Sequence, residues 1–352
     1  MAPELSARAA ALAPPHAYSG PRVQAHLRAE AEDFLVEEDL GFAPAGCGTH
    51  LLLKVRKVNA NTAWVARELA RLAGCRPHEV GYAGLKDRRA VALQWFSVPR
   101  PRVESDWRAV RAPDFQVLEA HAHTRKLPRG ALAGNRFAIR LRAGAGSGAS
   151  LARSLAAPLE LIARLGVPNY FGPQRFGRDG ANLGRLGADP RRLKPAERGL
   201  VLSAARSVVF NAVLAERVAA GSWGQLLPGD LASLEGRGSY FAVPAVEESL
   251  RLRCARLEIH PTGPLWGQGV SEARDAPGEL EARVAARYPA ECGTCTAAGM
   301  RPERRSLRLA VHELRVQVEP EALVLHFRLG RGSFATAVLR ELIEAPAALT
   351  DG

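Results

Sequence analysis

The chain is poor in cysteine, and this bears on both disulfide and metal sites. It has five cysteines in 352 residues, an odd and small number that does not suit a disulfide framework and favours a reducing cytoplasm. Cys292 and Cys295 have the spacing of a metal knuckle, but no second pair of ligands follows them. We therefore expect two thiols in a polar loop and no metal site.

Long apolar runs are also missing. No window approaches the ~18 uninterrupted apolar residues of a membrane span, so no membrane segment is expected. The first twenty residues lack a basic start followed by an apolar block and do not resemble a secretory signal; we expect a loose lead-in there. Apolar residues make up 47% of the chain, which excludes disorder of the whole chain.

Acidic residues are outnumbered. Lys and Arg total 48 against 36 Asp and Glu, so the formal net charge is +12, with a pI of about 10.1. This excess favours a polyanionic partner such as nucleic acid. Only five of the basic residues are lysines, and so strong a preference for arginine also fits a GC-rich genome. The charge alone leaves both explanations open.

The hydrophobic pattern indicates an α/β chain with an insertion. Alternating apolar residues predict strands, and i, i+4 spacing predicts helices, in the segments before residue 166 and after residue 305. The strands are expected near 32–37, 51–56, 80–83, 95–98, 137–141, 307–311 and 323–329, and the helices near 62–73, 151–162, 201–218 and 333–343. The stretch 166–305 is punctuated by Gly and Pro, apart from its long helix. At ~150 residues per domain, we predict a discontinuous catalytic domain, 1–165 with 306–352, and an inserted domain, 166–305.

The segment Gly81–Arg88 (GYAGLKDR) is the most informative window for chemistry. Asp87 lies on a glycine-bearing loop between two predicted strands, where its carboxylate can be presented to a substrate. The cationic neighbours Lys86, Arg88 and Arg89 favour its ionised form. From the spacing alone Asp87 could be a nucleophile, a general base or half of a surface ion pair.

Six strings in this sequence resemble the pseudouridine synthase D (TruD) family, in the family's order. The central one is GYAGLKDRRAVALQWFSV at 81–98. The others are EDFLVEE at 32–38, GTHLLLKVRKVNANT at 48–62, RKLPRGALAGNRF at 125–137, GVPNYFGPQRFGRDGANL at 166–183 and GSFATAVLRELI at 332–343. One G-x-K-D string would be weak, but six ordered strings are specific.

The resemblance implies a tRNA pseudouridine synthase that isomerises uridine, typically at position 13, without a cofactor. It implies a pseudouridine-synthase core of α/β (α+β) class with a mixed, mostly antiparallel sheet, an inserted family-specific domain, and a basic cleft between the two. Asp87 falls on the catalytic aspartate, and Phe34, Asn135 and Phe334 fall on positions that contact the target uridine. Arg89 stands where the family has a His, and Pro128 interrupts the basic run Lys126–Arg129. Both departures put local RNA contacts in question.

Each of these residues also has a plainer interpretation. Phe34 has strand spacing and could be core, Phe334 could fasten a helix capped by Ser333, and Asn135 could be a turn residue. Two further residues are candidates for supporting roles: Lys86 could steady Asp87 or contact a phosphate, and Tyr82 could pack beneath the loop. Glu37 and Glu38 point to opposite faces of a strand, so joint acid–base work by them is not expected.

Two other classes of function compete with an isomerase. A non-catalytic RNA-binding or RNA-chaperone protein would keep the basic surface without needing Asp87. A glycosidase would need a second carboxylate suitably placed near Asp87, and none is evident. Nothing in the sequence demands more than a monomer, and the expected partner is transfer RNA in the cytoplasm.

Overall fold

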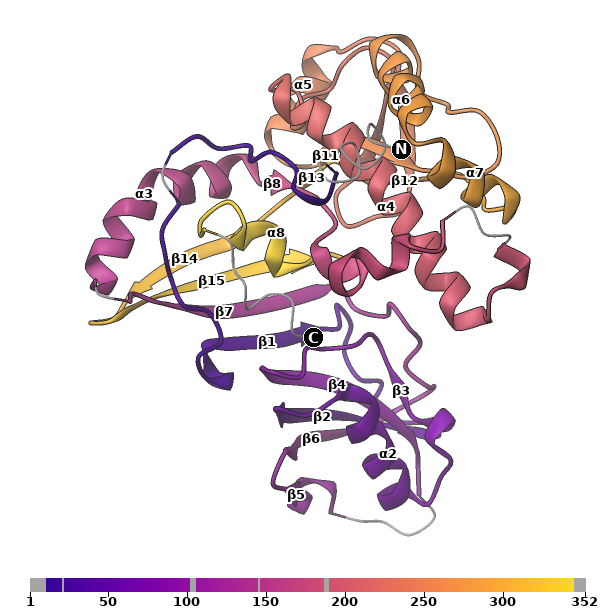
Figure 1. Cartoon of the computed structure of the whole chain (residues 1–352). Coiled ribbons are helices and arrows are strands. Elements are labelled where there is room, and N and C mark those ends of the chain that lie inside the picture. Colours follow the sequence, from indigo (N-terminus) through magenta and orange to yellow (C-terminus); the bar gives the residue numbers. More distant parts are fainter. Residues whose placement is uncertain (1–10, 21, 102–105, 145, 187–189, 345–352) are drawn as a thin grey trace. The chain divides into compact units, whose positions relative to one another are not determined.

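The computed structural model describes residues 11–20, 22–101, 106–144, 146–186 and 190–344. They form two compact units (Figure 1). The unit that we call the sheet unit consists of the described parts of Arg22–Ala156, His312–Ala335 and Ile343–Gly352. The middle unit consists of those of Met1–Pro21, Ala157–Val311 and Thr336–Leu342. The predicted catalytic domain, 1–165 with 306–352, differs from the sheet unit, because the described part of 1–21 and residues 157–165, 306–311 and 336–342 group with the middle unit. The assignment of a catalytic and an inserted domain stays a prediction.

The sheet unit is built on a nine-stranded sheet in the order β14-β15-β7-β1-β4-β2-β6-β5, with β3 paired to β4. Among the described residues, β1 and β4 form its one parallel pair, so the sheet is mixed and mostly antiparallel, as predicted. The strands are β1 (Phe34–Asp39), β2 (His50–Val58), β3 (Gly81–Tyr82), β4 (Val91–Pro99), β5 (Arg111–Ala112), β6 (Phe115–His123), β7 (Gly134–Arg142), β14 (His312–Val318) and β15 (Ala322–Gly330).

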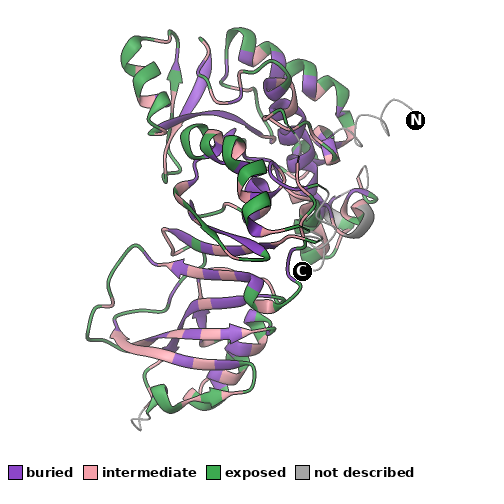
Figure 2. Ribbon diagram, turned by 90° about the vertical axis from the view of Figure 1, so that its left-hand side faces the viewer, coloured by how far each residue is buried: buried purple, intermediate pink, exposed green. Residues whose placement is uncertain are grey.

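The register of β1 defines the face of the sheet that concerns function. Phe34, Val36 and Glu38 are buried and alternate with less buried neighbours, an alternation that Figure 2 shows along the strands. Residues directly opposite each other on paired strands point to the same face. Glu38 pairs with Asn135 of β7, and Asn135 pairs with Leu329 of β15. We call this side the site face.

Helix α2 (Thr62–Ala73) begins after Asn61 and ends at Gly74, whose φ of 64° is the left-handed conformation that glycine adopts easily. The helix was predicted with these limits. Val65 and Leu69 pack with Val55 and Phe96 in one core cluster. Leu72, three residues after Leu69, is by contrast 39% exposed.

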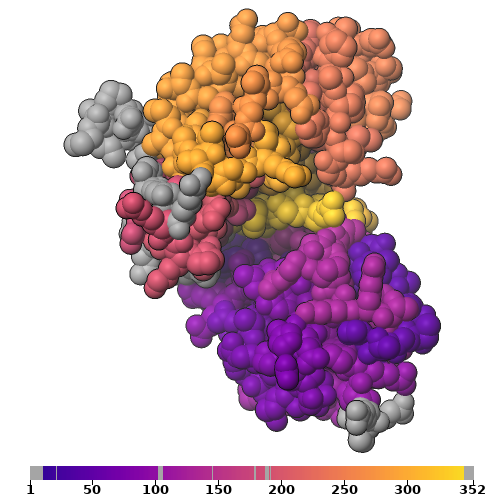
Figure 3. Space-filling model, turned by 90° about the vertical axis from the view of Figure 1, so that its right-hand side faces the viewer, coloured from indigo at the N-terminus to yellow at the C-terminus, as the bar shows by residue number. Residues whose placement is uncertain are grey.

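The neighbouring strand β2 has buried apolar residues on both of its faces. Leu53 and Val55 belong to the first cluster, and Leu52 is fully buried with Leu40, Trp95 and Leu127 in a second one. The opposite face of β2 therefore also has an apolar patch. In Figure 3 the first part of the sheet unit, indigo to magenta, forms one continuous surface.

The middle unit is organised around α4 (Pro195–Ala219), a helix buried along most of its length. By length and composition α4 alone among the described helices could cross a membrane, but 72% of its most apolar window is buried inside the protein, as in a core helix. The remaining helices and strands are α3 (Gly148–Leu165), β8 (Val167–Pro168), β9 (Asp230–Leu234), β10 (Tyr240–Val243), α5 (Glu248–Ala255), β11 (Ile259–Leu265), α6 (Asp275–Arg287), α7 (Pro289–Ala297), β12 (Glu303–Ser306), β13 (Arg308–Leu309) and α8 (Ala335–Leu339). Helices α3 and α8 are each divided between the two units.

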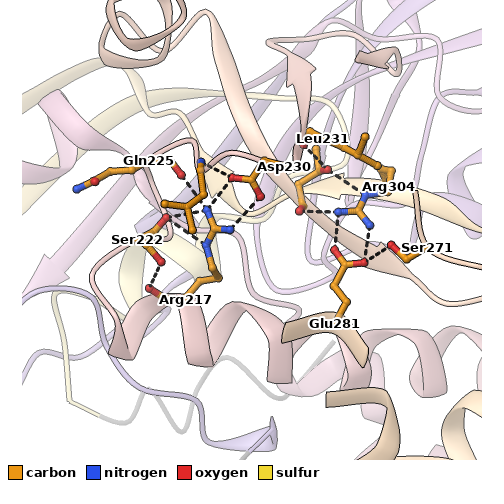
Figure 4. Close-up of polar contacts among 10 residues, drawn as sticks. Arg217, Ser222, Gln225, Asp230, Leu231, Ser271, Glu281 and Arg304 are labelled. Atoms are coloured by element: carbon orange, nitrogen blue, oxygen red, sulfur yellow. Dashed lines mark hydrogen bonds and ion pairs between the residues drawn. The ribbon is translucent and has the colours of Figure 1, made fainter. Parts of the chain in front are cut away.

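Two buried arginine–carboxylate pairs hold the middle unit together (Figure 4). Arg217 donates to both oxygens of Asp230, at 2.9 and 3.1 Å. Arg304 donates to both oxygens of Glu281, at 2.7 and 3.0 Å. Bidentate pairing satisfies both charges of each pair away from water, which makes these groups structural.

Several predictions for this part of the chain were wrong in detail. Residues 1–10 lie outside the described residues, but 11–20 are no loose lead-in: Ala11 is buried in the core of the middle unit, and the Tyr18 hydroxyl donates to the Gly166 carbonyl. The strand expected over 307–311 is only β13, paired with β8. The helix expected to reach Ile343 ends at Leu339, where i→i+3 bonds tighten the chain.

Candidate active site

The loop that carries Asp87 joins β3 to β4; we call residues 83–90 the Asp87 loop. The strand before it, β3, packs closely against the segment around Leu127: a Cβ added at Gly81 would lie 2.5 Å from the Leu127 carbonyl oxygen. The Gly84 carbonyl accepts a hydrogen bond from the Gln94 amide at 2.7 Å, and the Lys86 N–H donates to the Thr62 hydroxyl at 3.1 Å. Thr62 in turn donates to Gln94 at 3.0 Å. The loop is thus tied to α2 and β4 along its length.

Lys86 is held by a buried carboxylate and not by Asp87, contrary to one expected role. Its ammonium lies 2.5 Å from Glu38, and the two side chains are 9% and 0% exposed. The other Glu38 oxygen accepts the Trp95 N–H at 2.8 Å. Lys86 therefore has little surface left for an RNA phosphate, and Glu38 anchors the loop.

Asp87 is paired with Arg28, which the sequence analysis did not single out. The Arg28 Nη2 lies 2.5 Å from Asp87 Oδ2; the arginine side chain is 3% exposed and the aspartate 38%. Arg28 has a φ of 56°, which is uncommon for a residue with a side chain. A buried cation in a constrained backbone thus fixes one carboxylate oxygen, while the carboxylate stays accessible from solvent.

Phe34 lies under the same arginine. The Arg28 guanidinium carbon is 4.2 Å from the centre of the Phe34 ring, and the ring meets Phe137 edge-on at 6.1 Å between centroids. Phe34 is only 3% exposed. In this structure the Phe34 ring supports the Arg28 guanidinium, and it is too buried for a base to stack on it.

Lys57 is hydrogen-bonded to the backbone of the Asp87 loop. Its fully buried ammonium donates to the carbonyl oxygens of Asp87, at 2.9 Å, and of Ala60, at 2.7 Å. Burial lowers the pKa of Lys57 to about 8, although the negative charge of Asp87 acts in the opposite direction. The backbone of the proposed catalytic residue is therefore fixed as firmly as its side chain.

Asn135 presents an unused acceptor on the site face. It is 9% exposed, and its Oδ1 is buried without a hydrogen-bond partner in the described structure. It stands directly opposite Glu38, which binds Lys86, so the register brings it beside the Asp87 loop. A buried acceptor left unpaired costs about 1–3 kcal/mol, and such a group in a native protein suggests a ligand that donates to it.

Phe334 follows the C-terminal end of β15, whose Leu329 pairs with Asn135 near the start of β7. Its ring is 43% exposed, and no ring or polar contact ties it to Asp87 in the described part of the chain. Arg28 thus contacts both Asp87 and Phe34. Asn135 is related to them only by strand register, which places it opposite Glu38, the partner of Lys86.

Tyr82 lies on β3, directly before the Asp87 loop. Its ring lies 5.9 Å from that of Phe96 and carries the Arg129 guanidinium at 3.8 Å from its centre. The Gly130 N–H donates to the Ala83 carbonyl at 2.7 Å, so the 125–137 string lies against the Asp87 loop. Exposed arginines therefore lie on the loop itself (Arg88 and Arg89) and on the adjoining 125–137 segment (Arg125 and Arg129).

The two spaced cysteines lie on a helix and not in the polar loop that was expected. Cys292 and Cys295 are both on α7, and Cys295 is buried. Burial raises the pKa of Cys292 to about 12 and that of Cys295 to about 11, which disfavours the thiolates that a metal binds. Within the described ranges no three His, Cys, Asp or Glu side chains gather to hold a metal ion.

Three ring-bearing residues of the middle unit are structural. His260 is buried, lies 2.7 Å from Glu235 and accepts from Arg308 at 3.0 Å. Tyr170 and Phe171, which belong to the family string at 166–183, lie in the buried core of the same unit.

Comparison with known proteins identifies similar chains. The family model for tRNA pseudouridine synthase D (TruD) matches residues 14–189 and 190–342. The tRNA pseudouridine synthase D of Nitrosococcus oceani is 45% identical over 344 residues, covering 95% of each chain. That of Azotobacter vinelandii is 46% identical over 345 residues, covering 96% of each.

A crystal structure provides an independent comparison of the fold. A Methanosarcina mazei protein, assigned as a tRNA pseudouridine synthase D, superposes with a TM-score of 0.74 over 94% of this chain and 95% of its own. At 21% identity, this likeness concerns the fold alone. Taken with the family model and the relatives above, it leads to one assignment: the chain belongs to the tRNA pseudouridine synthase D (TruD) family.

Proposed function

We propose that this protein converts a uridine of transfer RNA, at position 13, into pseudouridine, with Asp87 as the nucleophile and no cofactor. The names of the relatives support the reaction and the substrate class. The observation that carries the assignment of Asp87 is its geometry: an accessible carboxylate, one oxygen of which is fixed by the buried Arg28.

The chemistry needs a single accessible carboxylate. The N1–C1′ bond of uridine breaks, the base turns, and a C5–C1′ bond forms. The C5 proton is lost and N1 gains one, so product and substrate are isomers. Asp87 adds to C1′ of the sugar or to C6 of the base and is released again at the end. Because no electrons are gained or lost overall, no redox partner is required.

The neighbouring residues suit a uracil ring. Asn135 can accept from N3–H through its unpartnered Oδ1 and donate to a uracil carbonyl through its amide nitrogen. Phe334 has an exposed face on which a base could stack. Phe34, covered by Arg28, acts in this proposal by supporting the arginine that holds Asp87; its predicted direct contact with uridine stays a prediction.

Transfer RNA as the partner is supported by the charge around the loop. The chain carries a formal +12, and exposed arginines flank Asp87 in sequence and on the adjoining 125–137 segment. Such cations position RNA through its phosphates and carry little sequence information themselves. A monomer acting in the cytoplasm remains part of the proposal.

The rival functions have less support. A glycosidase would need a second working carboxylate, but Glu38 is fully buried and both its oxygens accept hydrogen bonds within the fold. A non-catalytic RNA-binding protein has no need for an accessible aspartate whose carboxylate is held by the buried Arg28 and whose backbone carbonyl is held by the buried Lys57.

The test is pseudouridine mapping on unmodified tRNA transcripts with wild type and Asp87→Asn. The amide keeps the shape of the side chain but cannot attack, so we expect no pseudouridine from the variant and an RNA affinity within severalfold of wild type. Turnover by Asp87→Asn near the wild-type rate would exclude Asp87 as the nucleophile. Inactivity of the wild type on every tRNA would exclude the proposed function itself.

A further inference from the structure

Leu85 is the most exposed large apolar side chain of the described sheet unit. It is 70% exposed and lies two residues before Asp87 in the same loop. Other exposed apolar side chains of the unit reach at most 53%, the value for Val318. A leucine so open to water gains nothing from burial in the free protein.

This exposure does not come from a loose loop. The residues on both sides of Leu85 are anchored: the Gly84 carbonyl on Gln94, and the Lys86 N–H on Thr62. Lys86 is anchored a second time by its ammonium on Glu38. The backbone therefore holds the leucine side chain outward in a defined place.

The position of Leu85 matches a gap that the proposed reaction creates. Two residues of chain span at most about 7 Å, so Leu85 stands that close to the backbone of Asp87. Chemistry on a base in a stacked strand requires that the nucleotide leave the stack, at a cost of a few kcal/mol. Proteins that open base steps commonly insert an apolar side chain such as leucine between the bases.

We propose that Leu85 is this wedge: it enters the tRNA base stack next to the target uridine and occupies the space that the flipped base leaves. The proposal rests on the proposed function. Exposed Arg88 follows on the same loop and is placed to hold the phosphates of the opened step. The anchored backbone makes insertion cheap, because no loop has to be ordered at that moment.

The test uses three variants. Leu85→Ala removes the wedge, Leu85→Met restores an apolar side chain of similar size, and Leu72→Ala is the matched control. Leu72 is also exposed and lies ten residues beyond Thr62 on α2, about 15 Å along the helix from the loop anchor. Single-turnover pseudouridine formation is measured at saturating enzyme, together with tRNA affinity and thermal stability.

We expect Leu85→Ala to slow the single-turnover step on the order of 10- to 100-fold, with affinity and stability unchanged, because opening the stack is no longer compensated. Leu85→Met and Leu72→Ala should remain within about threefold of wild type. A Leu85→Ala rate equal to that of wild type overturns the proposal, as does an equal loss in Leu85→Met.

A second measurement separates the wedge from the chemistry. In the Asp87→Asn background, a tRNA with 2-aminopurine beside the target uridine reports opening of the stack by increased fluorescence. Adding Leu85→Ala should reduce this increase severalfold; no reduction overturns the wedge. Because this measurement needs no turnover, it remains decisive if the protein forms no pseudouridine, a result that would refute the proposed function instead.

Discussion

The buried pair Glu38–Lys86 should contribute much more to stability than a surface ion pair. The change is Glu38→Gln, which leaves the Lys86 ammonium, 9% exposed, facing a neutral amide. Breaking one side of a buried pair costs about 3–5 kcal/mol. The sheet unit has the size at which 1 kcal/mol moves the melting temperature by about 2–4 °C, so its transition should fall by roughly 6–20 °C.

The double variant Glu38→Gln, Lys86→Met tests whether the pair itself is responsible. Gln keeps an acceptor for the Trp95 N–H, and Met fills the space of the lysine stem without its charge. We expect this variant to recover at least ~2 kcal/mol of the loss, a coupling typical of contacting charges. Glu68→Gln is the control, because its partner Arg71 is 70% exposed, and it should cost less than ~1 kcal/mol.

Unfolding followed by circular dichroism, with single-turnover kinetics beside it, provides both readouts. The activity of Glu38→Gln should fall as well, because the Asp87 loop loses one anchor. A melting temperature for Glu38→Gln within 2 °C of wild type would show that the buried pair contributes much less than the predicted ~3–5 kcal/mol. A double variant no more stable than the single one would show that the buried charge is not the cause.

Two further predictions concern groups around Asp87. The pKa of Lys57 is lowered to about 8 from 10.5, so the unfolded chain binds more protons between these values, and the free energy of unfolding should rise by up to ~3 kcal/mol from pH 8 to 10.5. Urea titrations should show this rise reduced in Lys57→Met; equal slopes would refute it. Phe334→Ala should slow isomerisation by an amount equivalent to ~1–3 kcal/mol of lost stacking, with no change in melting temperature, because its side chain is exposed. Phe34→Ala should slow isomerisation and also lower the free energy of unfolding by ~3–5 kcal/mol, because its ring is buried. An exposed Phe334 whose removal leaves the rate unchanged would not be a substrate contact.

Much of the fold was predictable because the later residues of strands such as β7 and β15 alternate between buried and less buried positions, and because Gly74 marks the end of α2. Strands β6 and β14 were missed, since β14 exposes most of its residues and has little apolar signal. The family resemblance directed attention to Asp87 but not to what holds it.

Arg28 lies 59 residues from Asp87, and Lys57 lies 30 residues away. No local spacing signals such contacts, and an isolated basic residue in this arginine-rich chain resembles many others. The burial of Phe34 under Arg28 could not be read from the sequence for the same reason, because strand alternation tells which face a ring joins but not what covers it.

The most direct test of the central claim is release of tritium from C5 of a single uridine. A tRNA transcript with [5-³H]uridine only at position 13 is incubated with wild-type protein and with Asp87→Asn. The account predicts release of one equivalent of tritium by wild type and none by the variant, since C5 loses its hydrogen only when the C5–C1′ bond forms. Release by Asp87→Asn at the wild-type rate, or none by wild type while uridines elsewhere in the tRNA are converted, would contradict it.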